Sequence, residues 1–222
     1  MFQEGVQVIL NRQSVIVPEG LPFILAAAIV TIGLGALGFS ILAGISLAVT
    51  FFVACFFRNP ARRSPDQEGL VISPADGKII KVEKVRCSDL LQGDFIKISV
   101  FMNVFNVHVN RIPYSGTVKR ICYNKGRFIS AHLDKASALN ENNAIVITTD
   151  KGHDILTVQI AGLIARRIVC WIKEGMPVKR GERFGLIRFG SRLDVYLPAA
   201  SRIAVNIGDL VRAGETVLGE LP

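Results

Sequence analysis

Ser191 is the residue whose setting most suggests chemistry. It follows Gly190 in "IRFGSRLDVYLP", where the Gly-Ser pair separates two apolar runs typical of β-strands. A serine hydroxyl becomes a nucleophile when a base takes its proton, and histidine is the commonest such base. The chain has 3 histidines. The chemistry of Ser191 therefore depends on which of them folds beside it.

His108 is the strongest candidate for that base. It lies in "VFMNVFNVHVNRIP", where strand alternation puts it among polar neighbours, and Arg111 follows closely. His153 follows "DKG" in a predicted hairpin turn and is interpreted as structural. His132, in the polar segment "SAHLDKAS", fits a structural or a catalytic role equally well.

Asp76 is the candidate acid. It stands in "ISPADGKI", and Pro-Ala-Asp-Gly is typical of a β-turn. The functional alternative is that Asp76 orients the imidazole of His108, as the acid of a Ser-His-Asp set does. Asp76, His108 and Ser191 come from three separate segments, so spacing alone does not establish that they meet.

The elements that must position these residues are short β-strands separated by glycine-containing turns. The composition of residues 71–222 predicts a mainly β (α+β) domain, an antiparallel sandwich or barrel with one or two short helices. One helix is expected over 130–140. Strands are expected over 77–85, 95–102, 116–123, 143–150, 154–162, 166–172, 183–190, 192–198 and 201–207.

The N-terminal part has a different character, because no charged residue occurs from Leu21 to Phe57. About 20 apolar residues suffice to cross a bilayer. The glycines of "GLGALG", residues 33–38, favour two short helices in a membrane-embedded hairpin over 21–57. A secretory signal is the alternative, but it requires a basic N-terminal region, and residues 1–20 contain Glu4 and Glu19.

The charge distribution indicates how the chain meets the membrane. Residues 58–70 form a linker that begins with Arg58, Arg62 and Arg63, which predicts that the following domain and the N-terminal segment lie on the cytoplasmic side. The net charge is +8, and no stripe of basic and aromatic residues indicates nucleic acid binding. Anionic lipid is the favoured partner.

The cysteines and a repeated glycine pattern bear on whether the chain binds a metal, forms disulfides or carries a modified lysine. The 4 cysteines are widely separated without a C-x-x-C pair, so no metal site or disulfide framework is predicted. "VKRGERFGLI" and "VRAGETVLGE" share a hairpin pattern found in lipoyl and biotin carrier domains, with Lys179 as the residue to be modified. Two turns that need glycine explain the pattern more simply.

Taken in order, the motifs resemble the compact form of the phosphatidylserine decarboxylases. The resemblance runs from Phe56 to the end of the chain and is carried by "FFRNPARRSP", "SPADGKI", "FMNVFNVHVNRIP", "KASALNENN", "AGLIARRI" and "FGSRLDVYLP". Two departures occur. Arg111 stands where many relatives have a second histidine, and Asn142 stands where relatives often have arginine in N-E-R.

The resemblance implies a specific chemistry. His108, oriented by Asp76, would take the proton of Ser191. Ser191 would then attack the carbonyl of Gly190 and cut the chain into a β chain, 1–190, and an α chain, 191–222. Residue 191 would become a pyruvoyl cofactor, without a metal, that binds the amine of phosphatidylserine as a Schiff base. Loss of CO2 would give phosphatidylethanolamine, with His108 protonating the carbon and Arg111 holding the phosphodiester.

The resemblance also implies an inner-membrane enzyme that is a heterodimer of self-cleaved chains, with a dimer of these as the default assembly. Two alternatives from other classes remain. A membrane-tethered serine hydrolase would use Asp76, His108 and Ser191 repeatedly in an uncut chain. A non-enzymatic lipoyl-like adaptor or carrier would not need His108.

Overall fold

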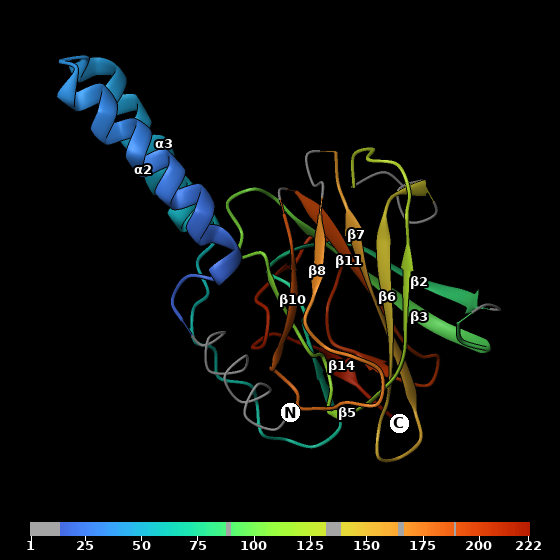
Figure 1. Cartoon of the computed structure of the whole chain (residues 1–222). Coiled ribbons are helices and arrows are strands. Elements are labelled where there is room, and N and C mark those ends of the chain that lie inside the picture. Colours follow the sequence, from blue (N-terminus) through green and yellow to red (C-terminus); the bar gives the residue numbers. More distant parts are fainter. Residues whose placement is uncertain (1–13, 88–89, 132–138, 164–166, 189) are drawn as a thin grey trace. The chain divides into compact units, whose positions relative to one another are not determined.

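The computed structural model describes residues 14–87, 90–131, 139–163, 167–188 and 190–222 of the chain (Figure 1). The chain divides into two compact units, Met1–Ala61 and Arg62–Pro222. The first unit carries the apolar helices and the second carries the strands, as Figure 1 shows.

The first unit is a helical hairpin. A short 3-10 helix, η2 (Pro18–Gly20), leads into α2 (Leu21–Ala36), and α3 (Ser40–Phe56) returns beside it. Gly38, with φ 81°, reverses the chain in a left-handed conformation that glycine adopts without strain. The predicted hairpin of two helices is therefore confirmed.

The surface of the hairpin is apolar, and its few hydroxyls face each other between the helices. The Thr31 hydroxyl lies 2.8 Å from that of Ser46 and 3.1 Å from that of Thr50. Such pairing satisfies polar groups that lipid cannot. The stretch Pro18–Ala36 is long and apolar enough to cross a membrane, whereas Ser40–Phe56 is shorter.

The second unit is built of antiparallel strands, and Leu139 is its one described α-helical residue. The predicted mainly β class is therefore confirmed. The strands are β1 (Leu70–Ile72), β2 (Gly77–Cys87), β3 (Gly93–Met102), β4 (Val109–Arg111), β5 (Gly116–Asn124), β6 (Asn142–Thr148), β7 (Asp154–Ala161), β8 (Ile168–Cys170), β9 (Pro177–Val178), β10 (Arg183–Ile187), β11 (Ser191–Pro198), β12 (Arg202–Ile203), β13 (Leu210–Val211) and β14 (Val217–Glu220).

The main sheet has eight strands in the order β13-β2-β3-β11-β7-β6-β5-β9, and two three-stranded sheets have the orders β4-β10-β8 and β1-β14-β12. Strand β11 lies inside the main sheet, between β3 and β7 (Figure 1). Its alternate residues Leu193, Val195 and Leu197 enter the main hydrophobic core. The small sheet packs on this side, since β8 and β10 contact β7.

Every strand expected from the sequence occurs, although the one expected over 201–207 is reduced to β12. The histidine block forms a strand only in β4, and His108 immediately precedes it. The helix expected over 130–140 falls largely on residues 132–138, outside the described residues. Strands β1, β4, β9, β13 and β14 are two to four residues long, too short to show an alternation pattern.

The repeated V-x-x-G-E pattern corresponds to two glycine turns. Gly181 and Gly214 both have φ 82°, the left-handed conformation that favours glycine in turns. The backbone N–H of Lys179 donates to the Glu182 carboxylate within the first of these turns. The simpler explanation of the repeat is therefore the one that the structure supports.

Candidate active site

Ser191 stands where the chain passes from one sheet to another. Strand β10 belongs to a three-stranded sheet and ends at Ile187, and β11 begins at Ser191 inside the eight-stranded sheet. The connection is therefore residues 188–190. Gly190 has φ 63°, and a residue with a Cβ would be strained there. This explains from the backbone why glycine precedes the serine.

The Ser191 side chain is buried on the core face of the main sheet. It lies opposite Met102 of β3 and Ala161 of β7, and the residue has 0% exposure. Its Oγ makes no hydrogen bond to any residue that the structure describes. Leaving a buried hydroxyl unpaired costs about 1–3 kcal/mol, so such groups are rare outside functional sites.

The carbonyl of Gly190 packs directly against Gly162, the residue after β7. A Cβ added to Gly162 would lie 2.0 Å from the Gly190 carbonyl oxygen and 3.0 Å from its carbon. Only glycine therefore allows this approach. The peptide bond before Ser191 therefore packs against Gly162, which is the glycine of the "AGLIARRI" motif.

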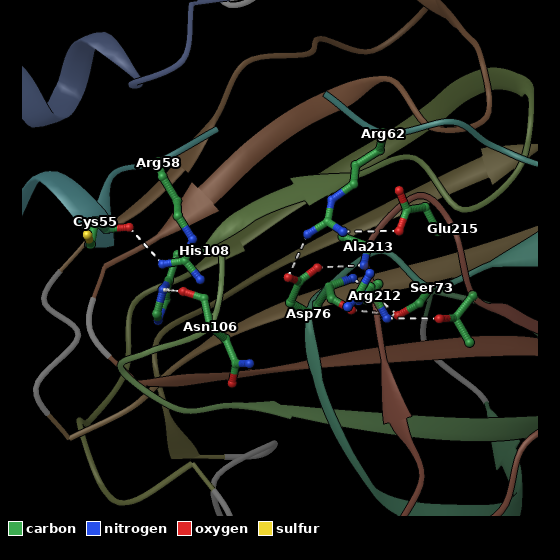
Figure 2. A network of polar contacts seen from close by, with 12 residues as sticks. Cys55, Arg58, Arg62, Ser73, Asp76, Asn106, His108, Arg212, Ala213 and Glu215 are labelled. Atoms are coloured by element: carbon green, nitrogen blue, oxygen red, sulfur yellow. Dashed lines mark hydrogen bonds and ion pairs between the residues drawn. The ribbon is translucent and has the colours of Figure 1, made fainter. Parts of the chain in front are cut away.

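His108 is buried, with 2% exposure, and its Nδ1 lies 2.9 Å from the carbonyl oxygen of Asn106 (Figure 2). A carbonyl can only accept, so Nδ1 carries the proton in this hydrogen bond. In the neutral ring, Nε2 is then the atom with a free electron pair. The ring is thus in the tautomer that a general base needs.

Asp76 lies in a different part of the polar network, also seen in Figure 2. Its Oδ2 accepts from Arg62 at 2.9 Å, and its Oδ1 accepts from the backbone N–H of Ala213 at 2.7 Å. Arg62 also contacts Glu215 at 3.1 Å. Among the described residues, Asp76 makes no hydrogen bond or ion pair with His108. The expected contact between the acid and the base is therefore not formed, and the Asn106 carbonyl occupies that position instead.

Arg111 belongs to the same charge cluster as Asp76. It has 6% exposure, and its Nη1 donates to the Gly181 carbonyl at 2.8 Å. Burial, helped by repulsion from Arg183 and Arg62, lowers the pKa of Arg111 to about 10, while Asp76 partly offsets the shift. The structure thus brings Asp76 together with Arg111, and the position of Arg111 is internal.

The other residues noted in the sequence are two asparagines that make hydrogen bonds and one histidine that lies outside the described residues. Asn140 donates from Nδ2 to the carbonyls of Ile129 and Ala161, both at 2.7 Å, so it braces the residue opposite Ser191. Asn142 donates to the Asn140 carbonyl at 3.0 Å. His132 lies outside the described residues.

Three buried side-chain amides were not predicted from the sequence. Asn110, Asn143 and Gln159 lie in the interior beside the core face of β11, although nothing in their spacing indicated that they meet. His153 lies in the hairpin turn expected for it, where its carbonyl accepts from the Thr149 N–H at 2.9 Å.

A groove of about 760 Å³ lies on the opposite face of the main sheet and is lined by Asp194 and Tyr196, among others, but not by Ser191 or His108. Arg192 and Asp194 are both fully buried on this face and form a bidentate ion pair, with N···O distances of 2.6 and 2.7 Å. This groove and the candidate catalytic residues are therefore on different sides of β11.

Comparison with known proteins gives first a class, decarboxylating lyases, and then a family within it. A family model described as phosphatidylserine decarboxylase matches residues 49–219. The chain is 53% identical over 211 residues to the phosphatidylserine decarboxylase proenzyme of Syntrophus aciditrophicus, covering 95% of this chain and 99% of that one. It is 50% identical over 212 residues to the proenzyme of Desulfotalea psychrophila, covering 96% and 99%. The chain belongs to the phosphatidylserine decarboxylase family, which confirms the resemblance inferred from the motifs.

Proposed function

We propose that this protein converts phosphatidylserine to phosphatidylethanolamine and CO2, using a pyruvoyl group made when the chain cuts itself between Gly190 and Ser191. The observation that carries the proposal is the buried Oγ of Ser191, which has no hydrogen-bond partner among the described residues and directly follows a left-handed glycine. The word proenzyme in the names of its relatives fits a self-processed chain.

Self-cleavage begins with proton transfer from Ser191 Oγ to Nε2 of His108. Oγ adds to the carbonyl carbon of Gly190, the peptide C–N bond breaks, and the released amine takes up a proton, so the amide becomes an ester. The imidazole of His108, neutral again after giving its proton to the released amine, then takes the Cα proton of residue 191. The Cβ–Oγ bond breaks, and its electron pair stays on Oγ, which leaves a carboxylate on Gly190. Water converts the resulting dehydroalanine to the pyruvoyl group with release of ammonia.

Alternation along the chain supports the role of His108. Asn110 lies in β4 and His108 stands two residues before it, so the strand alternation, if continued to position 108, would place both side chains on one face. The Asn110 side chain reaches Met102, the residue paired with Ser191. The same face thus carries His108 toward the Ser191 layer. After self-cleavage, we propose the same imidazole as the acid that protonates the product carbon.

Position 191 suits the group that is proposed to form there. Met102 and Ala161 would hold it on either side, and the core around them excludes water. When present, a pyruvoyl ketone binds the substrate amine and accepts the electrons released with CO2. Because Ser191 has 0% exposure in the uncut chain, substrate access would require the new end at Gly190 to move away.

The sheet topology supports a stable pair of cleaved chains. The α chain, 191–222, would contribute β11, which is flanked on both sides by β3 and β7 of the β chain. Strand β14 likewise pairs with β1. The two products would remain joined by backbone ladders and by the shared core.

Asp76 enters the proposal as a counter-charge. Its contacts with Arg62 and its proximity to Arg111 suit a role in neutralising the arginines around the histidine block. Arg111 stays the predicted phosphodiester contact, although its burial and its bond to Gly181 favour an internal role. A raised KM for phosphatidylserine in Arg111→Lys with unchanged thermal stability would support the phosphate contact, and lost stability with an unchanged KM would remove it.

A membrane location follows from the substrate and from the apolar stretch Pro18–Ala36. Moving acyl chains out of a bilayer costs about 0.8 kcal/mol per CH2, so the enzyme gains by working at the surface. We propose the inner membrane, with residues 62–222 on the cytoplasmic face. Arg63 is exposed and available to anionic head groups, whereas Arg62 is engaged by Asp76 and Glu215.

The decisive test is intact-mass analysis of the full chain in detergent, beside Ser191→Ala and His108→Gln. We expect the wild type to give fragments of residues 1–190 and 191–222, the smaller one blocked by a pyruvoyl group. Ser191→Ala should stay whole, and His108→Gln should be cut about 10²–10⁴ times more slowly. CO2 release from phosphatidylserine would then be measured on the cut enzyme. A wild-type chain that never divides, in detergent or in lipid, would overturn the proposal and favour the serine hydrolase.

A further inference from the structure

A row of three buried side-chain amides runs beneath the candidate site. Asn143 of β6 donates from Nδ2 to Gln159 Oε1 of β7 at 2.9 Å, and Gln159 donates from Nε2 to Asn110 Oδ1 of β4 at 2.8 Å. All three residues are buried to within 1% of complete. In the structure the oxygen of Gln159 and that of Asn110 each accept from the preceding residue of the row, so the amides are aligned in one direction.

The direction of the row determines where the Asn110 amino group points. Because Oδ1 is used by Gln159, Nδ2 is turned the other way, toward the sulfur of Met102 at 3.8 Å. A thioether is a weak acceptor. Among the described residues no oxygen accepts from this Nδ2, so a buried amide donor is left with unused capacity.

Met102 is the residue directly opposite Ser191 in the β3–β11 ladder. Directly opposed residues in antiparallel strands project to the same face and are neighbours. The unused donor of Asn110 contacts the side chain of Met102, and the cross-strand partner of Met102 is Ser191, whose Oγ has no hydrogen-bond partner among the described residues. Buried donors and acceptors that lack partners carry a free-energy cost, and here a donor and an acceptor of complementary type occur together.

Self-cleavage offers a moment at which the two would pair. When the Cα proton of residue 191 is removed and the Cβ–Oγ bond breaks, the electron pair of that bond passes to Oγ, which becomes part of the Gly190 carboxylate. A neutral amide N–H in a water-excluded site stabilises such developing charge strongly. The Gln159 contact limits the movement that the donor needs, although Nδ2 must leave the Met102 sulfur to reach Oγ.

We propose that Asn110 is a further catalytic residue of self-processing, whose Nδ2 donates to Oγ of residue 191 as the ester is eliminated. This inference rests on the proposed function, because it concerns the second step of the same cleavage. Gln159 is the positioning residue that aims the donor, because its Nε2 contacts Asn110 Oδ1. Asn143 contacts only the other end of the Gln159 amide.

The test compares Asn110→Leu with Asn143→Leu in the full chain. Both replacements remove a fully buried amide, and each leaves Gln159 without one partner, so they match in size and in structural damage. We expect Asn110→Leu to slow the appearance of the 1–190 and 191–222 fragments by about 10²–10³. Asn143→Leu should remain within a few-fold of the wild type by the same mass measurement.

Hydroxylamine identifies the step that is blocked. It cleaves esters but not ordinary amides, so an uncut chain that holds the ester would release a β chain ending in a Gly190 hydroxamate and an α chain beginning with serine. We expect this in Asn110→Leu and not in Ser191→Ala. Asn110→Asp, which keeps the Oδ1 acceptor for Gln159 and loses the donor, repeats the experiment should the leucine variant fail to fold.

The outcomes separate this inference from the one on which it rests. Asn110 variants that are cut at the wild-type rate, or that stay folded and uncut but insensitive to hydroxylamine, would overturn the role of Asn110 while the wild type still divides. Equal slowing in Asn143→Leu would also overturn it, because the effect would then come from general damage to the row. A wild type that never divides would instead overturn the proposed function.

Discussion

The two faces of strand β11 bury polar groups in opposite ways. On the core face, Ser191 has an Oγ with no hydrogen-bond partner among the described residues. On the other face, Arg192 and Asp194 are just as buried and are joined by two short N–H···O contacts. The two arrangements begin at neighbouring residues of one strand, so backbone position does not explain the difference.

The difference separates a reactive group from an anchoring one. A paired charge inside a protein is held firmly, and breaking the pair is costly, whereas an unpaired hydroxyl is free to take a new partner. The anchored pair would keep the start of the α chain in the sheet while the neighbouring residue reacts. Ser191 on one face would thus react, while Arg192 and Asp194 on the other face would keep the α chain in the sheet.

The largest effect is expected on the paired face. In the uncut Ser191→Ala chain, Asp194→Leu should lower the free energy of unfolding by about 3–5 kcal/mol, because it leaves the buried Arg192 guanidinium without its counter-charge. Urea unfolding in a mild detergent would measure it. The double variant Arg192→Leu with Asp194→Leu is the control and should lose much less, since no charge stays buried. A double variant as unstable as the single one would contradict the assignment.

A smaller effect is expected from Gly162→Ala on the reactive face. The added Cβ would lie 2.0 Å from the Gly190 carbonyl oxygen, so the scissile bond must shift. A misplacement of about 1 Å costs a reaction on the order of 10²-fold in rate, and self-cleavage timed by mass spectrometry should slow by that factor. Gly44→Ala, where a Cβ meets nothing within 4 Å, should be cut like the wild type. Wild-type cutting in Gly162→Ala would mean that the carbonyl needs no such support.

The sequence predicted the strands better than the contacts between distant residues. Alternating runs such as 192–198 predicted β11, because a strand whose one face enters an apolar core has a period of two in its side chains. Asp76 was expected beside His108, but tertiary contacts pair it with Arg62 and with the N–H of Ala213. Neither partner has a sequence signal, since a backbone N–H is present at almost every residue.

The amide row and the role of Gly162 could not be predicted from the sequence either, because both depend on contacts between distant segments. Asn110, Gln159 and Asn143 come from three strands whose order in space is set by topology, and a buried asparagine looks like a surface one in the sequence. Gly162 appeared only as one letter of a family motif. The requirement for glycine there depends on a carbonyl 28 residues further along the chain, since 190 − 162 = 28.

The smallest expected effect tests whether an unpaired hydroxyl is enough to mark a reactive position. Ser99 is fully buried on the paired face, directly opposite Asp194, and its Oγ also lacks a hydrogen-bond partner among the described residues. The residue before it is Ile98, not a left-handed glycine. Ser99→Ala should therefore raise the free energy of unfolding of the uncut chain by about 1 kcal/mol, because an unsatisfied polar group is removed.

The same Ser99→Ala replacement, made in the chain that retains Ser191, should leave the rate of self-cleavage unchanged. Reactivity then depends on the combination at Ser191, an unpaired hydroxyl together with the Gly190 carbonyl, the His108 imidazole and the Asn110 donor. Slower cutting in Ser99→Ala would mean that polar groups on both faces of β11 act on the reaction, and the division between a reactive and an anchoring face would no longer hold.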